Sequence, residues 1–361
     1  MEIIQNKVGR PGNEIIYKKV DYADKKYVVG SVKYNDTILK FIIDDEDYIK
    51  IKEIKGDASF RKYFRINCKN KSYILASAEQ EKKSNILNYV LINKFLSKQG
   101  ISAPKVIDYD YKNGLALLQD FGDKTYLQLI KKSKNKFSIY QSLIKYLIKL
   151  QRINYKTNIF RFKKYNFKIL KKEIDLFFIW YLPHILKIKN NPKIKKLRKL
   201  LLSILKNNFI KNNYFVHRDF HVSNMMEYKE GSKNNIGIID TQDALIGSRA
   251  YDILSLIDDV RIKTSPELKE KLLNYYLLLV KKEKHFNMQQ FKKEFSILSV
   301  QRAMKIIGIF SRLFKRDKKS RYLKLIPYAW TILNKRLEDP IFNEVSIIIN
   351  RQIKLRSKNV N

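Results

Sequence analysis

One short segment of this 361-residue chain concentrates side chains that can handle protons and metal ions. It reads F-V-H-R-D-F-H-V-S-N-M-M, runs from Phe215 to Met226, and is apolar at both ends. An Asp followed five residues later by an Asn, here Asp219 and Asn224, suits phosphoryl transfer. The Asp carboxylate can accept a proton from an attacking hydroxyl, and the Asn side-chain oxygen can bind Mg²⁺, which neutralises phosphate charge.

A second carboxylate stands where it could complete a metal site. The apolar run Ile236–Ile239 predicts a strand, and Asp240 follows it directly. A turn through Lys229–Asn235 would make this region a hairpin, which would bring Asp240 back beside Asn224. The tripeptide His-Arg-Asp alone fits an ordinary polar loop, but loop, hairpin and second Asp together favour phosphoryl transfer.

The elements that must position these residues divide the chain into two parts. Before about residue 120, short segments rich in β-branched and aromatic residues predict strands, with one helix that Gly100 would cap. Beyond Gly122, apolar residues at helical spacing predict a mostly helical part. The predicted strands are Tyr27–Val32, Thr37–Ile43, Tyr48–Ile54, Lys62–Ile66, Ser72–Ala76, Leu115–Gln119, Tyr214–Val216 and Ile236–Ile239. The predicted helices are Ser84–Gln99, Ile139–Leu150, Phe167–Trp180, Ile194–Asn208, Glu267–Lys281, Phe291–Phe314 and Tyr322–Leu337.

This layout predicts an α+β fold with a β-rich N-lobe, a hinge near residue 120 and a helical C-lobe. We assign residues 1–50 to an N-terminal β-rich extension, 51–121 to the N-lobe and 122–361 to the C-lobe. The sequence contains no internal repeat and no Gly/Pro/Ser-rich linker long enough to separate independent domains.

The chain is strongly basic, with 74 Lys and Arg against 35 Asp and Glu and a formal net charge of +39. Such a balance fits either a nucleic-acid-binding face or a generally basic solvated surface. Because Lys is spread through nearly every segment, we favour the solvated surface and expect no specific nucleic-acid partner. Polyanions should bind nonspecifically and be released as salt rises.

Cysteine content and hydropathy indicate the compartment. The single cysteine, Cys68, excludes an intrachain disulfide and fits a reducing environment. The first residues carry no apolar signal-peptide region, and the most apolar run, Leu176–Leu182, is far shorter than the ~20 residues that span a bilayer. We therefore expect a cytoplasmic protein with no membrane partner.

Five separated motifs, in order, resemble a known family over about residues 51–340. H-R-D-F-H-V-S-N and I-D-T-Q-D-A resemble the aminoglycoside-phosphotransferase-type, protein-kinase-like superfamily. Within it, they are most similar to the bacterial anomeric N-acetylmuramate/N-acetylglucosamine kinases. The other similar segments are Gly56–Ile66 (G-D-A-S-F-R-K-Y-F-R-I), Leu117–Leu127 (L-L-Q-D-F-G-D-K-T-Y-L), Thr241–Asp259, and the helical strings V-Q-R-A-M-K-I-I-G-I-F-S-R-L and R-Y-L-K-L-I-P-Y-A-W-T-I-L.

The resemblance implies a bilobal protein-kinase-like fold that uses ATP and Mg²⁺. Its N-lobe would bind the nucleotide, and its C-lobe would carry the catalytic and acceptor-binding residues. Asp219 is implied as the catalytic base, and Asn224 and Asp240 as the metal ligands. His217 and Arg218 would support the loop rather than react.

The resemblance also implies a nucleotide site. A Gly followed by small residues lets backbone N–H groups approach phosphates. The hinge would meet adenine mainly through backbone groups. The residues implied at the phosphates are Gly56, Asp57, Ala58, Ser59 and Phe60, and those at the hinge are Gln119, Asp120 and Phe121.

Some residues keep two interpretations. Asp252 resembles the family Asp that stabilises the catalytic loop, or it is a surface Asp near a helix start. Gln242 and Asp243 either face the acceptor sugar or form a polar turn. Tyr328 and Trp330 could stack on a sugar ring, although aromatic residues on helices more often belong to the core.

The sequence departs from the protein-kinase pattern at two points. No V-A-I-K lysine occurs, and Ala76 or Ser77 stands in its place, as is usual in the sugar-kinase group. Thr241 replaces a Phe that normally packs into the core, so the packing nearby must differ. The missing phosphate contact could come from Arg65, Lys82 or Lys83.

These observations predict an ATP- and Mg²⁺-dependent small-molecule kinase. By resemblance, the acceptor is the anomeric hydroxyl of an amino sugar, N-acetylmuramate or N-acetylglucosamine, in cell-wall recycling. The alternatives are a kinase of another small hydroxyl acceptor, such as an aminoglycoside, and a non-catalytic basic nucleic-acid-binding protein. A protein kinase is disfavoured because the sequence has no A-P-E-like segment.

Overall fold

The computed structural model describes most of the chain. The described residues are 3–7, 13–22, 25–34, 37–44, 49–54, 61–68, 71–78, 83–156, 160–208, 210 and 213–354. The segment Gly56–Phe60, which the sequence assigns to the nucleotide phosphates, lies outside them, as does Lys82. Two compact units make up the chain: unit 1 comprises residues 1–83 and 107–120, and unit 2 comprises residues 84–106 and 121–361. Residues 84–106, which we placed in the N-lobe from the sequence, therefore group with unit 2.

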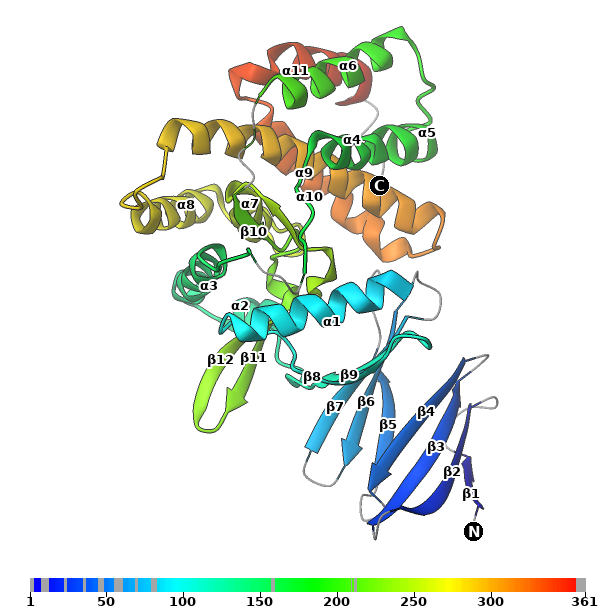
Figure 1. Ribbon diagram of the computed structural model, residues 1–361. Helices are drawn as coiled ribbons and strands as arrows, with labels where there is room; N and C mark the ends of the chain where they lie inside the picture. Colours follow the sequence, from blue (N-terminus) through cyan, green and yellow to red (C-terminus); the bar gives the residue numbers. More distant parts are fainter. Residues whose placement is uncertain are drawn as a thin grey trace. The chain divides into compact units, whose positions relative to one another are not determined.

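Unit 1 contains two sheets (Figure 1). One is four-stranded and antiparallel, with its strands in chain order, and it occupies the N-terminal region in which the sequence predicts β structure. Its first two strands were not predicted. These strands are β1 (Ile3–Lys7), β2 (Asn13–Tyr22), β3 (Lys25–Tyr34) and β4 (Thr37–Asp44).

The second sheet of unit 1 has five strands in the order β5-β6-β7-β9-β8. Successive side chains of a strand point to opposite faces, which explains why Phe64 and Ile66 are both buried. The predicted strand Leu115–Gln119 has the same bounds in the structure. The strands are β5 (Ile49–Ile54), β6 (Lys62–Cys68), β7 (Lys71–Ser77), β8 (Val106–Asp110) and β9 (Leu115–Gln119).

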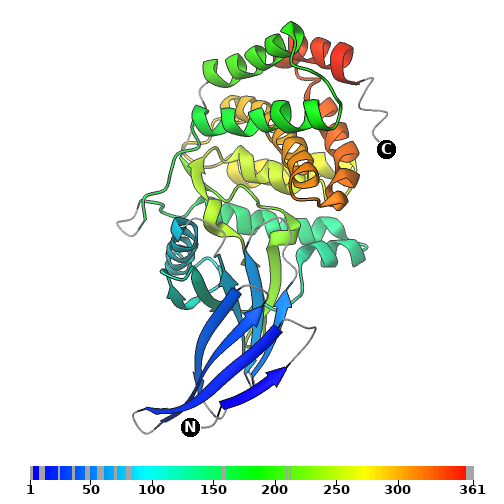
Figure 2. The same ribbon diagram turned by 90° about the vertical axis from the view of Figure 1, so that its right-hand side faces the viewer.

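Unit 2 is mostly helical, as predicted for the C-lobe. Its longest described helix is α9 (Met288–Lys315), and α4, α7 and α10 pack against it (Figures 1 and 2). The other helices are α1 (Lys83–Lys98), α2 (Tyr126–Lys132), α3 (Lys136–Gln151), α4 (Phe167–Leu176), α5 (Leu182–His184), α6 (Pro192–Asn207), α7 (Ala250–Ile257), α8 (Pro266–Val280), α10 (Ile326–Arg336) and α11 (Asn343–Ile349). None of the helices in the described chain is both long enough and apolar enough to cross a membrane.

Two predicted helices are interrupted in the structure. The predicted helix Phe167–Trp180 changes after α4 into a π-helical turn, Phe177–Tyr181, just before Pro183, which has no N–H to donate within a helix. The predicted helix Tyr322–Leu337 begins as a 3₁₀ helix, Ser320–Leu325. Helix α10 starts only at Ile326, where Pro327 is suited to the first helical turn.

Two small antiparallel sheets in unit 2 flank the polar segment of the sequence. Strand β10 (Tyr214–Val216) pairs with β13 (Leu245–Gly247). Strand β11 (Met225–Glu230) pairs with β12 (Lys233–Ile238). This is the predicted hairpin, but β11 was not predicted as a strand, and the turn is shorter than the predicted Lys229–Asn235. The loop from His217 to Asn224 connects the two sheets. Because it carries Asp219, the predicted base, it is called the catalytic loop below.

Candidate active site

Buried residues anchor the catalytic loop at both ends. Phe215, Val216 and Met225 are at most 1% exposed and belong to the hydrophobic core of unit 2. Inside the loop, the His221 amide donates to the Asp219 carbonyl at 2.9 Å, and the Asn224 amide donates to the His221 carbonyl at 2.9 Å. These bonds make the loop compact.

The hairpin returns Asp240 to the end of the catalytic loop, as the sequence predicted. In the ladder, Met225 is paired with Ile238, and one step further the Ile239 amide donates to the Asn224 carbonyl at 3.0 Å. Asp240 follows with φ +65° and ψ +44°, a left-handed conformation that Asp tolerates better than most residues. The Gln242 side chain donates to Asp240 Oδ1 at 2.8 Å.

The polar atoms of Asn224 and Asp240 suit a hard cation. The Asn224 amide nitrogen donates to the Asp219 carbonyl at 3.1 Å, so the other end of this side chain is an oxygen. Within the described residues, no group of three His, Cys, Asp or Glu side chains could hold a metal ion. Mg²⁺ commonly takes only one or two protein oxygens and completes its shell with water and substrate phosphates. An Asn–Asp pair therefore fits Mg²⁺ bound with a nucleotide better than a structural metal.

Asp252 supports the start of the catalytic loop from α7. It is fully buried, which excludes the surface interpretation, and its carboxylate accepts the His217 amide at 2.7 Å and the Arg218 amide at 3.0 Å. Burial raises the pKa of Asp252 to about 7, although the two amide hydrogen bonds act in the opposite direction.

His217 is a neutral hydrogen-bonding group in this site. Burial lowers its pKa to about 4. Its Nε2 lies 3.1 Å from the Ile239 carbonyl, which can only accept, so Nε2 carries the proton. His217 thus links the catalytic loop to the strand that leads into Asp240.

Arg218 adopts a backbone conformation that is costly for a non-glycine residue. Its φ is +74°. Its guanidinium donates to the Glu173 carboxylate, donates to the Asp243 carbonyl at 3.2 Å, and lies 5.6 Å from the centre of the Tyr165 ring. Such strain costs on the order of 1–3 kcal/mol and persists only where the surroundings determine the conformation.

A buried carboxylate, Glu173 of α4, gathers several donors beneath Arg218. Lys305 of α9 lies 3.1 Å from it, Gln301 donates to it at 2.7 Å, and the Tyr165 hydroxyl donates to it as well. Neither Glu173 nor Lys305 was predicted from the sequence to be a functional residue. Both lie on the apolar faces of predicted helices. A charged residue at such a position was the sequence feature that could have identified them.

The Asp219 side chain is charged and available. Burial acts to raise its pKa, but the positive charges around it, that of Lys305 above all, hold the pKa below its usual range. Within the part of the chain that the structure describes, no hydrogen bond or ion pair ends on this carboxylate. It can therefore accept a hydrogen bond from an incoming hydroxyl at neutral pH.

Thr241, which stands where a Phe was expected, makes a polar contact in the core. It is fully buried, and its hydroxyl donates at 2.5 Å to the side-chain oxygen of Asn93, which is also fully buried on α1. The expectation that packing must differ here is confirmed, because a hydrogen-bonded pair occupies this position.

The predicted hinge residues have different surroundings. In unit 1, the Asp120 carboxylate accepts Arg65 Nε at 2.5 Å and the Ser72 hydroxyl at 2.5 Å, so its side chain is engaged within the sheet. Arg65, one alternative for the phosphate contact, is therefore already paired. In unit 2, Phe121 stacks on Tyr228 with ring centres 4.3 Å apart.

The residues considered for acceptor contact lie in different environments. Gln242 is half-buried and bonded to Asp240, whereas the side chain of Asp243 is 61% exposed. Trp330 is buried and donates to the Tyr181 hydroxyl at 2.5 Å, and the Tyr328 hydroxyl accepts the Thr264 amide at 3.0 Å. The core interpretation therefore holds for Trp330.

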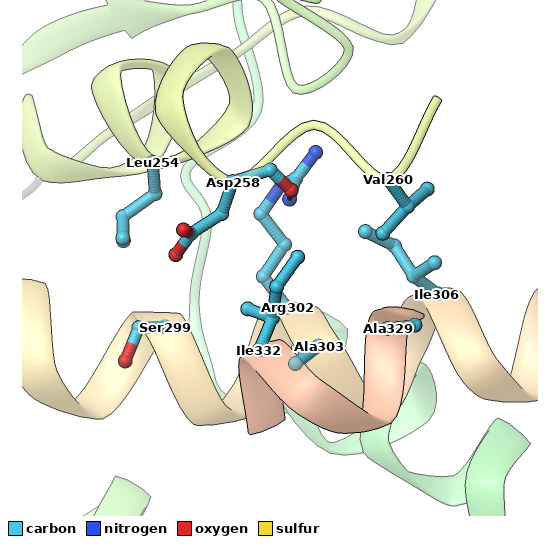
Figure 3. Close-up of a pocket in the computed structure, with 9 residues that line it drawn as sticks. All are labelled: Leu254, Asp258, Val260, Ser299, Arg302, Ala303, Ile306, Ala329 and Ile332. Atoms are coloured by element: carbon cyan, nitrogen blue, oxygen red, sulfur yellow. Dashed lines mark hydrogen bonds between the residues drawn. The ribbon is translucent and has the colours of Figure 1, made fainter. Parts of the chain in front are cut away.

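A small cavity lies at the α7–α9–α10 contact (Figure 3). Its volume is about 10 Å³, which holds about one water molecule and is far too small for a sugar ring. Its lining residues are Leu254, Asp258, Val260, Ser299, Arg302, Ala303, Ile306, Ala329 and Ile332.

Comparison with known proteins defines the class to which this fold and site belong. Residues 50–291, about two thirds of the chain, match the model of the phosphotransferase enzyme family. The chain belongs to this family, and it is a phosphotransferase of the kinase type with a hydroxyl acceptor.

Several curated relatives share one function. The chain is 29% identical to the N-acetylmuramate/N-acetylglucosamine kinase of Pseudomonas putida over 284 residues, which covers 78% of this chain and 81% of the relative. It is 28% identical to the kinases of the same name from Pseudomonas aeruginosa and Caulobacter vibrioides, over 78% and 75% of this chain and 83% and 76% of those relatives.

Solved structures support the fold. An ADP-bound aminoglycoside phosphotransferase matches with a TM-score of 0.53 at 16% identity, over 81% of this chain and 94% of that one. A Plasmodium vivax ethanolamine kinase matches with a TM-score of 0.55 at 16% identity, over 82% of this chain and 84% of that one. The predicted bilobal, protein-kinase-like α+β fold is therefore confirmed.

Proposed function

We propose that this chain transfers the γ-phosphate of ATP, with Mg²⁺, to the anomeric hydroxyl of an amino sugar such as N-acetylmuramate or N-acetylglucosamine. One observation carries the proposal: the catalytic loop and the hairpin bring Asn224 next to Ile239 and Asp240, on the loop that presents Asp219. The relatives, which are N-acetylmuramate/N-acetylglucosamine kinases, support the acceptor class. The pathway is the reuse of cell-wall sugars in the cytoplasm.

In this mechanism, the acceptor hydroxyl donates a hydrogen bond to Asp219. The acceptor oxygen attacks the γ-phosphorus, the bond to the bridging oxygen breaks, and ADP leaves with that electron pair. The hydroxyl proton passes to Asp219. A carboxylate of low pKa suffices, because in a loose transition state the proton can move late and the main task is orientation.

The metal would be held by the Asn224 and Asp240 oxygens and would neutralise phosphate charge. Gln242 would orient Asp240 by its hydrogen bond, and with Asp243 it would stand close to the acceptor. Asp252, His217 and Arg218 would keep the loop in register. The proposed nucleotide-contacting residues are Gly56, Asp57, Ala58, Ser59 and Phe60 at the phosphates and Gln119, Asp120 and Phe121 at the adenine.

A radiolabelled ATP assay tests the proposal. The purified chain is incubated with Mg²⁺ and with N-acetylmuramate, N-acetylglucosamine, an aminoglycoside or a generic protein substrate. We expect transfer to an amino sugar, a product that loses its phosphate readily in acid, and a loss of at least about 10²-fold in kcat for Asp219→Asn.

The same assay can refute the proposal. An equally active Asp219→Asn variant would remove the proposed base, and absence of transfer to every acceptor would remove the sugar-kinase function. Transfer to the aminoglycoside alone would keep the reaction and replace the acceptor. The melting temperature of Asp219→Asn, measured alongside, separates lost chemistry from lost folding.

A further inference from the structure

Two helices remote in sequence place a buried ion pair under the catalytic loop. Glu173 of α4 is 5% exposed and Lys305 of α9 is 6% exposed, and their side chains meet at 3.1 Å. Burying two charges is expensive unless other groups satisfy them. The Tyr251 hydroxyl accepts from Lys305 at 3.1 Å, and Gln301 donates to Glu173 at 2.7 Å, so both ions have further partners.

The helix crossing explains how these charges meet. One turn beyond Lys305, Gly308 faces the α4 backbone so closely that an added Cβ would lie 2.5 Å from the Leu176 carbonyl carbon and 2.6 Å from the Phe177 nitrogen. Leu176 is itself one turn beyond Glu173. The absence of a side chain at residue 308 thus lets the helices approach at the level of the ion pair.

Arg218 connects the Glu173–Lys305 ion pair to Asp219, the proposed base. Glu173 accepts from the Arg218 guanidinium, and Arg218 directly precedes Asp219 in the chain. The left-handed backbone of Arg218 is fixed from several sides: its amide donates to Asp252, its carbonyl accepts from Ser255 at 3.4 Å, and its side chain is held by Glu173. A change at residue 218 would rotate the peptide that presents Asp219.

We propose that Glu173, assisted by Lys305, is a positioning residue for phosphoryl transfer: it holds the strained Arg218 and thereby aims the Asp219 carboxylate at the acceptor hydroxyl. The inference rests on the proposed function, because it takes Asp219 as the base. Neither Glu173 nor Lys305 needs to touch either substrate.

The test combines kinetics with a double-mutant cycle. Glu173→Gln keeps the side-chain volume but removes the charge that pairs with Arg218, and Arg218→Gln removes the other partner while leaving Glu173 paired with Lys305. We expect each variant to lower kcat for N-acetylglucosamine about 10- to 100-fold, with the KM for ATP within about twofold, because small displacements of a reacting group cost that much. The double variant should be no slower than the slower single variant.

Asp175→Asn is the matched control. Asp175 lies on the same helix, but its carboxylate pairs with Arg198 of α6 at 2.7 and 2.9 Å and with Lys171 at 3.2 Å instead of with Arg218. Its loss should leave kcat within about twofold of wild type. Hydrogen exchange of residues 217–224, followed by mass spectrometry, should accelerate in Glu173→Gln and not in Asp175→Asn, and this readout needs no acceptor.

The outcomes separate the two proposals. If Arg218→Gln keeps wild-type kcat, or if exchange of the loop is unchanged in Glu173→Gln, the positioning role is wrong even when Asp219→Asn is inactive. If Asp219→Asn is fully active, the proposed base fails, while the exchange measurement still decides whether Glu173 orders the loop. If Glu173→Gln does not fold, Arg218→Gln carries the decision, because its Glu173–Lys305 pair remains intact.

Discussion

A hydroxyl–amide contact connects α1 to the segment that follows the proposed metal ligand. Thr241 lies directly after Asp240, and its hydroxyl donates to Asn93 in a fully buried environment. The Asn93 amide nitrogen has no hydrogen-bond partner among the described residues. A buried polar group that loses its partner keeps its full desolvation cost. Breaking this hydrogen bond should therefore cost more free energy than the bond itself contributes to stability.

Removal of one partner should therefore cost more than removal of both. We expect Thr241→Val to lower the free energy of unfolding by about 1–3 kcal/mol, because it leaves the Asn93 oxygen unpaired. Adding Asn93→Leu should recover part of this loss. Urea unfolding of the single and double variants measures the effect, and Thr331→Val, at an exposed threonine of α10, is the control. A double variant less stable than Thr241→Val would contradict the argument.

At the scale of elements, the closest constraint is the crossing of α4 and α9 at Gly308. A glycine inside a helix normally costs stability relative to alanine, by about 0.5–1 kcal/mol. Here the neighbouring atoms at 2.5 and 2.6 Å are backbone atoms of Leu176 and Phe177, which cannot move aside as a flexible side chain can. The steric cost of a methyl group should therefore exceed the gain in helix propensity.

Gly308→Ala should consequently destabilise the protein. We expect a loss of about 1–3 kcal/mol, the range for overpacking, together with a lower kcat, because the helices separate at the level of Glu173 and Lys305. Thermal unfolding and the acceptor assay measure the two effects. A variant that melts higher than wild type would show that helix propensity dominates and that the crossing is not tight.

The elements also show how far sequence reasoning reaches. The spacing of apolar residues predicted the long helices to within a few residues, and the pattern of β-forming residues predicted the bounds of β9. Both patterns involve residues close together in the sequence, so the sequence alone reveals them. Helix α2, with 7 residues, was missed because it is too short to show a period. The pairing of Glu173 with Lys305 depends on how α4 crosses α9, and a single sequence does not encode that crossing in any local pattern.

The same contrast holds for the candidate site. The hairpin that returns Asp240 to Asn224 was predicted from the apolar strand Ile236–Ile239 and the turn before it, although the first strand of the hairpin, Met225–Glu230, was not predicted. The loop support by Asp252 came only from the resemblance, since 35 residues separate Asp252 from His217. The nucleotide-contacting residues Gly56–Phe60 remain a prediction, because they lie outside the described residues.

At the scale of the whole molecule, acid should act on a chain that already carries a formal net charge of +39. Protonation of carboxylates raises this charge further, and self-repulsion favours expansion. The buried histidines add a specific effect in the same direction. Burial lowers the pKa of His217 to about 4 and that of His221 to about 3, whereas an unfolded His titrates near 6.5.

The sign of this effect follows from proton counting. Between pH 6.5 and about 4, His217 and His221 are protonated in the unfolded chain but neutral in the folded protein. The free energy of unfolding must therefore fall as the pH falls through this window. Asp252 opposes the trend: because its pKa is raised from 3.8 to about 7, the folded protein holds a proton there that the unfolded chain releases. Two histidines against one carboxylate leave a net loss of stability toward acid.

We therefore expect urea unfolding at pH 7, 6, 5 and 4 to give a steadily decreasing free energy of unfolding. His221→Gln, which keeps a polar side chain but cannot titrate, should flatten the curve between pH 6.5 and 4. Asp252→Asn should make the free energy of unfolding fall more steeply with decreasing pH, because the folded variant no longer takes up the proton that Asp252 binds. His285→Gln is the control, because it replaces an exposed histidine and leaves both buried histidines in place. Curves of equal slope for wild type and His221→Gln would show that His221 is protonated in the folded protein, and the burial argument for the catalytic loop would then be wrong.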